Sequence, residues 1–228
     1  LDQDGESIKI IVLKGSEIRK KGLWKDITNK ALGGVPGLQK EGTDGIITSA
    51  EFILYPKFKA TRTICLEFFG PDMEEASHVI VELSKAFPFP DQGEETLIAL
   101  EHFDDEYVRA IAYQVKSSRF KTPKAVLLID VAGHSPEQTQ RGIDKIRAIL
   151  EQHPNSELFE AHDAAEAERY WADRKKFGAI ARRTNAFKLN EDVVIPLETL
   201  AEFARFIDAV NIEEERYAQL KFLERAAA

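Results

Sequence analysis

The sequence has 228 residues, of which 43% are hydrophobic and 31% charged, which is the composition of a folded globular protein rather than a disordered one. Its net charge of −8 argues against nucleic-acid binding, because a protein that binds a duplex needs a surplus of lysine and arginine. The apolar runs are far shorter than the ~18 residues of a membrane span, and a single cysteine, Cys65, excludes an intrachain disulfide. We therefore expect a cytoplasmic protein and leave open its attachment to the inner face of the membrane.

Residues 1–56 read as the end of a domain. Their first predicted strand, 8–14, has no preceding strand with which it could pair, and the chain begins at Leu1. The region closes with the stretch EGTDGIITSAEFILYP, in which a glycine-rich turn leads into an apolar strand that Pro56 stops. We expect the front of this domain to lie before residue 1 and a second domain to begin at residue 57.

From residue 57 onward, strands and helices alternate. The predicted strands are 60–69, 96–103, 123–133, 157–161 and 186–196. The predicted helices are 72–87, 104–116, 135–152, 164–183 and 197–225. Asp72 and Ser135 are expected to be N-caps, with Pro136 at the first helical position. This order predicts an α+β fold with the helices on one face of a sheet.

The last predicted helix carries an apolar stripe with a period close to that of an α-helix. The stripe consists of Leu197, Leu200, Phe203, Ile207, Val210, Tyr217 and Leu220. We therefore expect helix 197–225 to dock on the sheet.

Motifs of the common enzyme classes are missing from the sequence. It contains no Gly-x-Ser-x-Gly elbow, no P-loop and no Gly-x-Gly-x-x-Gly fingerprint, so hydrolase and kinase functions have no support. The five histidines are scattered without the spacing of metal ligands, and we expect no metal site. Cys65 is centred in an apolar strand and is expected to be a buried small hydrophobe rather than a nucleophile. We expect no catalytic residue within this sequence.

One group of residues could bind a ligand. On helix 164–183, Trp171, Arg174, Gly178 and Arg182 share one face, and Lys188 lies on the next predicted strand. A guanidinium and an ammonium on adjacent elements can hold a carboxylate, the arginine through a fork of two hydrogen bonds. The alternative is a solvated basic face in which Lys188 pairs with neighbouring carboxylates, and the pattern by itself favours this alternative.

Two stretches resemble a known family. EGTDGIITSAEFILYP is similar to the stretch that ends the FAD-binding domain of FAD-linked oxidases. WADRKKFGAIARRTNAFKLNEDVVIPLETL resembles the cap-domain signature of the same family, which includes D-lactate dehydrogenase, the glycolate oxidase flavin subunit and D-2-hydroxyglutarate dehydrogenase. The resemblance implies that residues 1–56 are the C-terminal part of an α+β FAD-binding domain. Residues 57–228 would then form most of a cap domain with a ferredoxin-like antiparallel sheet.

The resemblance also implies which residues touch the ligands. The FAD contacts would come from Gly42, Thr43, Gly45, Ile46 and Ile47. Glycines suit such a turn because they accept positive φ and leave no side chain between the backbone and a cofactor. Arg174 and Lys188 would hold the substrate carboxylate, and Gly178 stands where some relatives have a threonine that contacts the substrate.

The implied function is the FAD-dependent oxidation of a 2-hydroxy acid of the D-lactate, glycolate or D-2-hydroxyglutarate class, by hydride transfer to the flavin. The electron acceptor is left open. The catalytic base, any metal and any iron–sulfur cluster would lie outside these residues, so we expect this segment to be inactive alone.

Two alternative functions stay open. One is a non-catalytic ferredoxin-like module that binds a small acid or has a regulatory role, and the other is a flavoenzyme for an alcohol, a phenol or a sugar.

Overall fold

A computed structural model describes residues 4–5, 49, 54, 57–87, 95–119, 121–176 and 195–226. The predicted strand 8–14 and residues 186–194 of the predicted strand 186–196 lie outside the described residues. The chain divides into two compact units, one of Leu1–Tyr55 with Asp192–Pro196 and one of Pro56–Glu191 with Leu197–Ala228. The fold below is that of the second unit.

The second unit is built on a four-stranded antiparallel sheet with the order β2-β3-β1-β4. Its strands are β1 (Ala60–Phe68), β2 (Glu95–Asp104), β3 (Ala125–Gly133) and β4 (Ser156–Glu160). The helix α2 (Glu74–Ala86) connects β1 to β2, and α4 (Pro136–Leu150) connects β3 to β4. This is the ferredoxin-like arrangement, so the predicted α+β class with an antiparallel sheet is confirmed.

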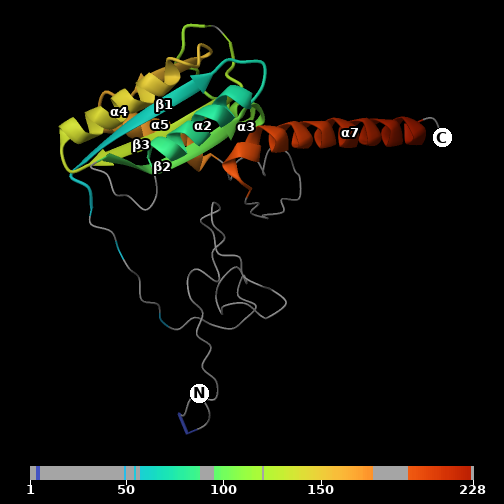
Figure 1. Ribbon diagram of the computed structural model, residues 1–228. Coiled ribbons are helices and arrows are strands. Elements are labelled where there is room, and N and C mark those ends of the chain that lie inside the picture. Colours follow the sequence, from blue (N-terminus) through green and yellow to red (C-terminus); the bar gives the residue numbers. More distant parts are fainter. Residues whose placement is uncertain are drawn as a thin grey trace. The chain divides into compact units, whose positions relative to one another are not determined.

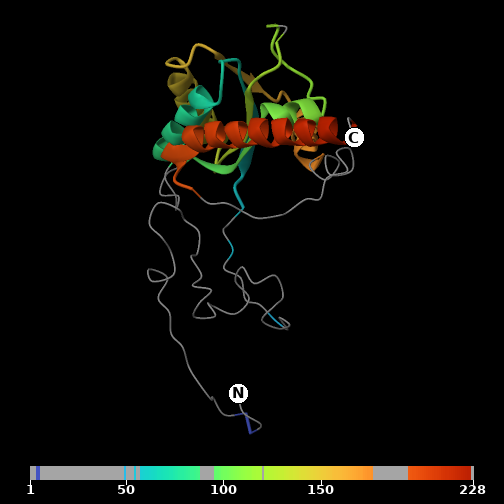
Figure 2. The ribbon, with the colours of Figure 1, turned by 90° about the vertical axis from the view of Figure 1, so that its right-hand side faces the viewer.

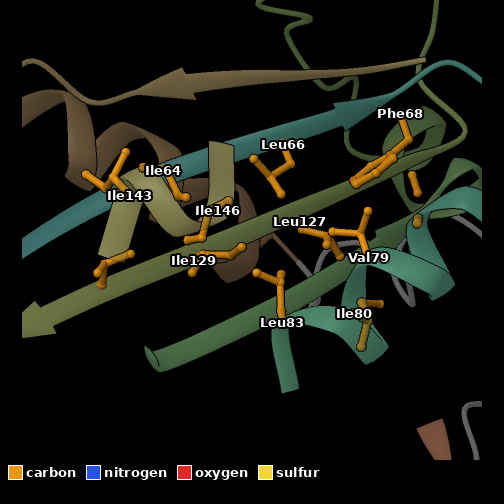
Figure 3. Packing of buried hydrophobic residues seen from close by; sticks show 13 residues of the cluster. Ile64, Leu66, Phe68, Val79, Ile80, Leu83, Leu127, Ile129, Ile143 and Ile146 are labelled. Atoms are coloured by element: carbon orange, nitrogen blue, oxygen red, sulfur yellow. The ribbon is translucent and has the colours of Figure 1, made fainter. Parts of the chain in front are cut away.

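The helices α2 and α4, labelled in Figure 1, form the larger apolar core together with one face of the sheet. Because side chains alternate along a strand, Ile64, Leu66 and Phe68 of β1 all point to this face. They meet apolar side chains of the two helices, among them Leu83 of α2 and Ile146 of α4 (Figure 3). Each of these five side chains is fully buried, which stabilises the fold by about 1.5–3 kcal/mol per residue.

The opposite face of the sheet carries the two shorter helices, α3 (Asp105–Ala110) and α5 (Ala164–Lys175). Buried strand residues such as Cys65 and Leu128 pack there with aromatic side chains, including Trp171 of α5. Helices α2 and α4 thus cover one face as expected, and α3 and α5 add a thinner layer on the other. This second side is called the α5 face below.

The helix predicted at 104–116 is much shorter in the structure. α3 begins after Asp104, whose Oδ1 accepts a hydrogen bond from Tyr107 N at 2.7 Å, and it ends at Ala110. Ala112 then takes a positive φ of 51°, which a helix cannot contain. The turn lets Lys116 N and Ser117 N reach the buried Glu67 carboxylate, so a tertiary contact overrides the local helical pattern.

Of the two predicted helix N-caps, the structure confirms Ser135 and places Met73 rather than Asp72 at the other. Ser135 caps α4 as expected, and Pro136 is its first residue. α2 begins two residues after Asp72, with Met73 in the cap position and no side-chain hydrogen bond from it. The Asp72 side chain still accepts a hydrogen bond from Glu74 N at 2.9 Å, so it performs part of the expected capping role.

The last helix docks only at its start. A short 3₁₀ turn, η2 (Leu197–Thr199), leads into α7 (Leu200–Ala226). Leu200 packs against the larger core. In the next turn Arg205 Nη1 lies 3.7 Å from Glu74 Oε2, so the beginning of α7 lies beside α2 (Figure 2).

Beyond that point, the prediction that helix 197–225 docks on the sheet is wrong. Tyr217 and Leu220 are 57% and 60% exposed, and none of the described residues of α7 is buried. The sequence contains the reason. The charged run 213–216 interrupts the stripe after Val210, so apolar residues do not form one continuous side of the helix.

Gly142 lets α4 approach the sheet closely. A Cβ at this position would lie 2.5 Å from Val131 Cγ1 on the central strand β3. Because Val131 is β-branched and buried, it has little freedom to move. We expect Gly142→Ala to lower the free energy of unfolding by about 1–3 kcal/mol, as overpacking does. Denaturant unfolding of the chain would measure this change.

The control for Gly142→Ala is Ala148→Gly, at an exposed position of the same helix. It measures helix propensity alone, which favours alanine by about 1 kcal/mol. A more stable Gly142→Ala protein would show that propensity outweighs the clash and that α4 can move away from Val131.

Candidate functional site

A partly buried polar contact at the centre of the α5 face holds α5 in place. Trp171 Nε1 donates a hydrogen bond to Asp130 Oδ1 on β3 at 3.0 Å. The same oxygen accepts a hydrogen bond from Thr63 Oγ1 on β1 at 2.6 Å. The helix itself is capped by Asp163, whose side chain accepts a hydrogen bond from Glu166 N at 2.7 Å. Helix α5 therefore has a fixed rotation about its axis, with Trp171 facing the sheet.

Arg174 lies three residues after Trp171 and reaches the edge strand β2. Its Nε donates a hydrogen bond to Glu101 Oε2 at 2.8 Å, and the two side chains are 45% and 37% exposed. The backbone at this point is also held. Tyr107 of α3 donates its hydroxyl to the carbonyl oxygens of Asp173, at 2.9 Å, and Arg174, at 3.3 Å. Arg174 is thus fixed through its side chain and through the last turn of α5.

Tyr107 is itself held by neighbouring residues. Its ring stacks on Phe103 with 4.8 Å between the centroids. Burial raises the pKa of Tyr107 above its usual value, so the hydroxyl keeps its proton and acts as a donor at neutral pH. The contact between α3 and the end of α5 is therefore a neutral hydrogen bond that does not depend on salt.

A cavity of about 200 Å³ opens beside Arg174. It is large enough for a small organic acid, since one water takes up about 30 Å³. Burial lowers the pKa of His102, which lines the cavity, and this favours the neutral imidazole. The lining residues are Glu101, His102, Phe103, Asp104, Tyr107 and Arg174.

The other residues that were expected to contact the substrate or the FAD lie outside the described part of the chain. Gly178 and Lys188 lie outside the described residues, and so does Arg182. The same holds for the residues expected at the FAD, which are Gly42, Thr43, Gly45, Ile46 and Ile47. Of the expected substrate contacts, the structure therefore describes Arg174 alone, together with its partner Glu101. Sequence reasoning did not identify Glu101, because it comes from a different element 73 residues earlier.

A buried carboxylate on the α5 face was also not predicted. Glu67 of β1 is 0% exposed. Its Oε1 accepts hydrogen bonds from Tyr113 Oη and Lys116 N, both at 2.8 Å, and its Oε2 accepts one from Ser117 N at 3.0 Å. The sequence did contain a signal for it, because a glutamate in the middle of an apolar strand is unusual. Side chains alternate between the two faces of a sheet, and Glu67 falls on the same face as Cys65.

Tyr113 connects this carboxylate to two further groups. Lys116 Nζ donates to the Tyr113 hydroxyl oxygen at 2.6 Å, and it also lies over the rings of Tyr113 and Tyr170 at 4.3 and 4.4 Å. Cys65 Sγ lies 3.2 Å from the same hydroxyl. Burial raises the pKa of the Cys65 thiol to about 11 and that of Tyr113 far above its usual value. Cys65 is therefore buried as predicted, and its thiol is protonated at neutral pH.

A second and larger cavity, of about 830 Å³, lies where β4 ends and α5 begins. Arg174 does not line it. Two of its cations, Arg62 and Arg147, both pair with Glu160, which offsets much of their charge. The charge of these arginines does not distinguish the two cavities, because Arg62 and Arg147 are themselves 37% and 52% exposed and Arg174 is also paired with a carboxylate. The smaller cavity is the candidate site because Arg174, the residue expected to hold the substrate carboxylate, lines it.

The N-termini of α3, α4 and α5 do not fit the pyrophosphate of FAD. The side chains of Asp104, Ser135 and Asp163 already cap α3, α4 and α5, and two of these caps carry negative charge. Within the described residues no group of three His, Cys, Asp or Glu side chains could hold a metal ion. No helix among them is long and apolar enough to cross a membrane.

The fold and the site together define an α+β domain with a polar pocket that contains one arginine, on the side of its sheet opposite the main core. Residues 68–220 match the family described as "FAD linked oxidases, C-terminal domain". The match covers more than half of the sequence, and the chain therefore belongs to this family. The family name implies FAD as the cofactor and gives no support for an iron–sulfur cluster.

The other comparisons add little. Among solved structures, the aminobenzoyl-glutamate utilization protein from Klebsiella pneumoniae is similar at 14% sequence identity and a TM-score of 0.28. The similarity covers 50% of this chain and 33% of that chain, and so low a TM-score carries no argument. No curated protein shows a matching sequence.

Proposed function

We propose that this chain is part of an FAD-dependent oxidoreductase that oxidises a 2-hydroxy acid, and that residues 57–228 form its substrate-binding cap. The observation that carries the proposal is Arg174 at the wall of the smaller cavity, in a chain of the FAD-linked oxidase family. A guanidinium is permanently charged and forks onto a carboxylate, which suits it to bind and orient an acid.

The remaining roles follow from the resemblance of the sequence to the family. Lys188 would hold the same carboxylate as a point charge, and Gly178 would leave space beside it. Residues 1–56 would complete the FAD-binding domain, with the turn at Gly42–Gly45 next to the flavin. FAD, when bound, would supply the acceptor for the hydride that leaves the α-carbon, and a base outside these residues would take the hydroxyl proton. The class of acid proposed is that of D-lactate, glycolate and D-2-hydroxyglutarate.

Replacing Arg174 tests this function. In the full-length, flavin-loaded protein that contains this chain, Arg174→Ala should lower kcat/KM for D-2-hydroxy acids at least tenfold, because losing a hydrogen bond to a charged group costs about 1.5–3 kcal/mol. Arg174→Lys should recover only part of the activity, because lysine restores the charge but not the fork. The measurement is steady-state kinetics over a panel of D-2-hydroxy acids with an artificial electron acceptor.

Arg169→Ala is the matched control, since Arg169 is an exposed arginine on the same helix. It should leave both the kinetics and the flavin content unchanged. Wild-type rates in the Arg174→Ala protein would remove Arg174 from the site. A flavin-loaded protein that binds the acids without turning them over would instead favour the non-catalytic module.

A further inference from the structure

We propose that Glu101 is a positioning residue that orients the Arg174 guanidinium toward the substrate, an inference that rests on the function proposed above. Glu101 lies on the edge strand β2, and Arg174 lies near the end of α5. The two side chains meet at the wall of the smaller cavity, which both of them line.

The atoms in contact decide which part of the guanidinium Glu101 constrains. Its Oε2 accepts from Nε, at 2.8 Å. A guanidinium is planar, so a bond at Nε fixes the plane and the direction of the whole group. The two terminal nitrogens lie in that same plane, so their direction is restricted as well. An acid that binds to them would meet donors whose direction is already set, which lowers the entropy lost on binding.

The backbone beneath Arg174 is held from the same direction. Tyr107 donates its hydroxyl to the carbonyl oxygens of Asp173 and Arg174, and its ring stacks on Phe103 of β2. β2 and the helix that follows it therefore contact both the side chain and the main chain of this one arginine. A solvated surface ion pair needs no such backbone support, whereas a binding residue gains from it.

An alternative is that Glu101 competes with the substrate for Arg174. A competing carboxylate would have to leave before an acid could bind, and its removal would strengthen binding. The positioning role predicts the opposite sign, because removal of Glu101 would free the guanidinium to adopt other directions. The sign of the change in KM therefore separates the two roles.

The experiment uses the full-length, flavin-loaded protein and the same panel of D-2-hydroxy acids. We expect Glu101→Ala to raise KM about threefold with little change in kcat, since a partly exposed ion pair contributes modestly. Glu101→Gln should restore most of the affinity, because the amide oxygen still accepts from Nε. In an Arg174→Ala background, Glu101→Ala should change nothing further, because it acts through Arg174.

The control is Glu106→Ala, which removes an ion pair of the same kind, with Arg109, from the neighbouring α3. It should leave KM unchanged. A second variant, Tyr107→Phe, removes only the hydroxyl and should also raise KM, while an unchanged melting temperature would show that the fold is intact.

Three outcomes would overturn the role of Glu101. They are a lower KM in Glu101→Ala, no rescue by Glu101→Gln, and an equal effect of Glu101→Ala when Arg174 is absent. If Arg174→Ala lowers kcat/KM and Glu101→Ala leaves it unchanged, the positioning role fails but the proposed function stands. If Arg174→Ala itself has no effect, the proposed function fails.

Discussion

Replacing Glu67 by alanine is expected to lower the free energy of unfolding by about 3 kcal/mol or more. The carboxylate is 0% exposed and accepts hydrogen bonds from Tyr113 Oη, Lys116 N and Ser117 N. Its removal leaves these donors without an acceptor on the α5 face, and each unsatisfied buried polar group costs about 1–3 kcal/mol. It also removes the negative charge that is linked to the Lys116 ammonium through the Tyr113 hydroxyl.

Urea unfolding of the chain would measure the loss, and a melting temperature lower by about 2–4 °C per kcal/mol should accompany it. Glu168→Ala, at an exposed position of α5, is the matched control and should change stability by less than about 0.5 kcal/mol. Glu67→Gln should be intermediate, because the amide keeps one acceptor but turns a donor toward other donors. A loss below about 1 kcal/mol in Glu67→Ala would show that water replaces the carboxylate.

Phe68→Ala is expected to lower the free energy of unfolding by about 3–5 kcal/mol, through lost burial and the cavity that remains. Phe68 is fully buried on the central strand β1 and packs in the core shared with α2 and α4 (Figure 3). Its neighbours come from several elements, so the cavity cannot close without moving the sheet or a helix. Denaturant unfolding with a constant m-value would give the loss directly.

The matched control is Phe206→Ala on α7, where the same truncation removes a side chain that is 60% exposed. It should change stability by less than about 1 kcal/mol. A large loss in Phe206→Ala would contradict the exposed position of α7, and a small loss in Phe68→Ala would contradict the core.

Much of the fold could be predicted because it depends on local patterns. A continuous apolar run predicted a strand at 123–133, and the structure has β3 at Ala125–Gly133, with residues buried on both faces. The cap at Ser135 and the start at Pro136 were recognised from the preferences of individual residues for helix ends. Antiparallel pairing and strand order agree with the ferredoxin-like arrangement that the family resemblance implied.

Predictions failed where distant contacts overrode the local pattern. The helical pattern at 104–116 continues past Ala110, yet the chain turns there so that Lys116 N and Ser117 N can bind Glu67. The stripe on the last helix suggested docking, but whether an apolar side is buried depends on what the rest of the chain places against it.

The candidate site shows the same division between sequence and tertiary structure. The sequence by itself determined that Arg174 shares a helix face with Trp171, because the helical period fixes which residues lie together. It also contained the family signature that makes an acid the expected ligand. Only the tertiary structure placed Glu101 against the Arg174 side chain and Tyr107 against the backbone at that point. These contacts join residues more than 60 positions apart, and hydrophobic periodicity carries no information about which distant polar groups meet when a sheet and its helices pack.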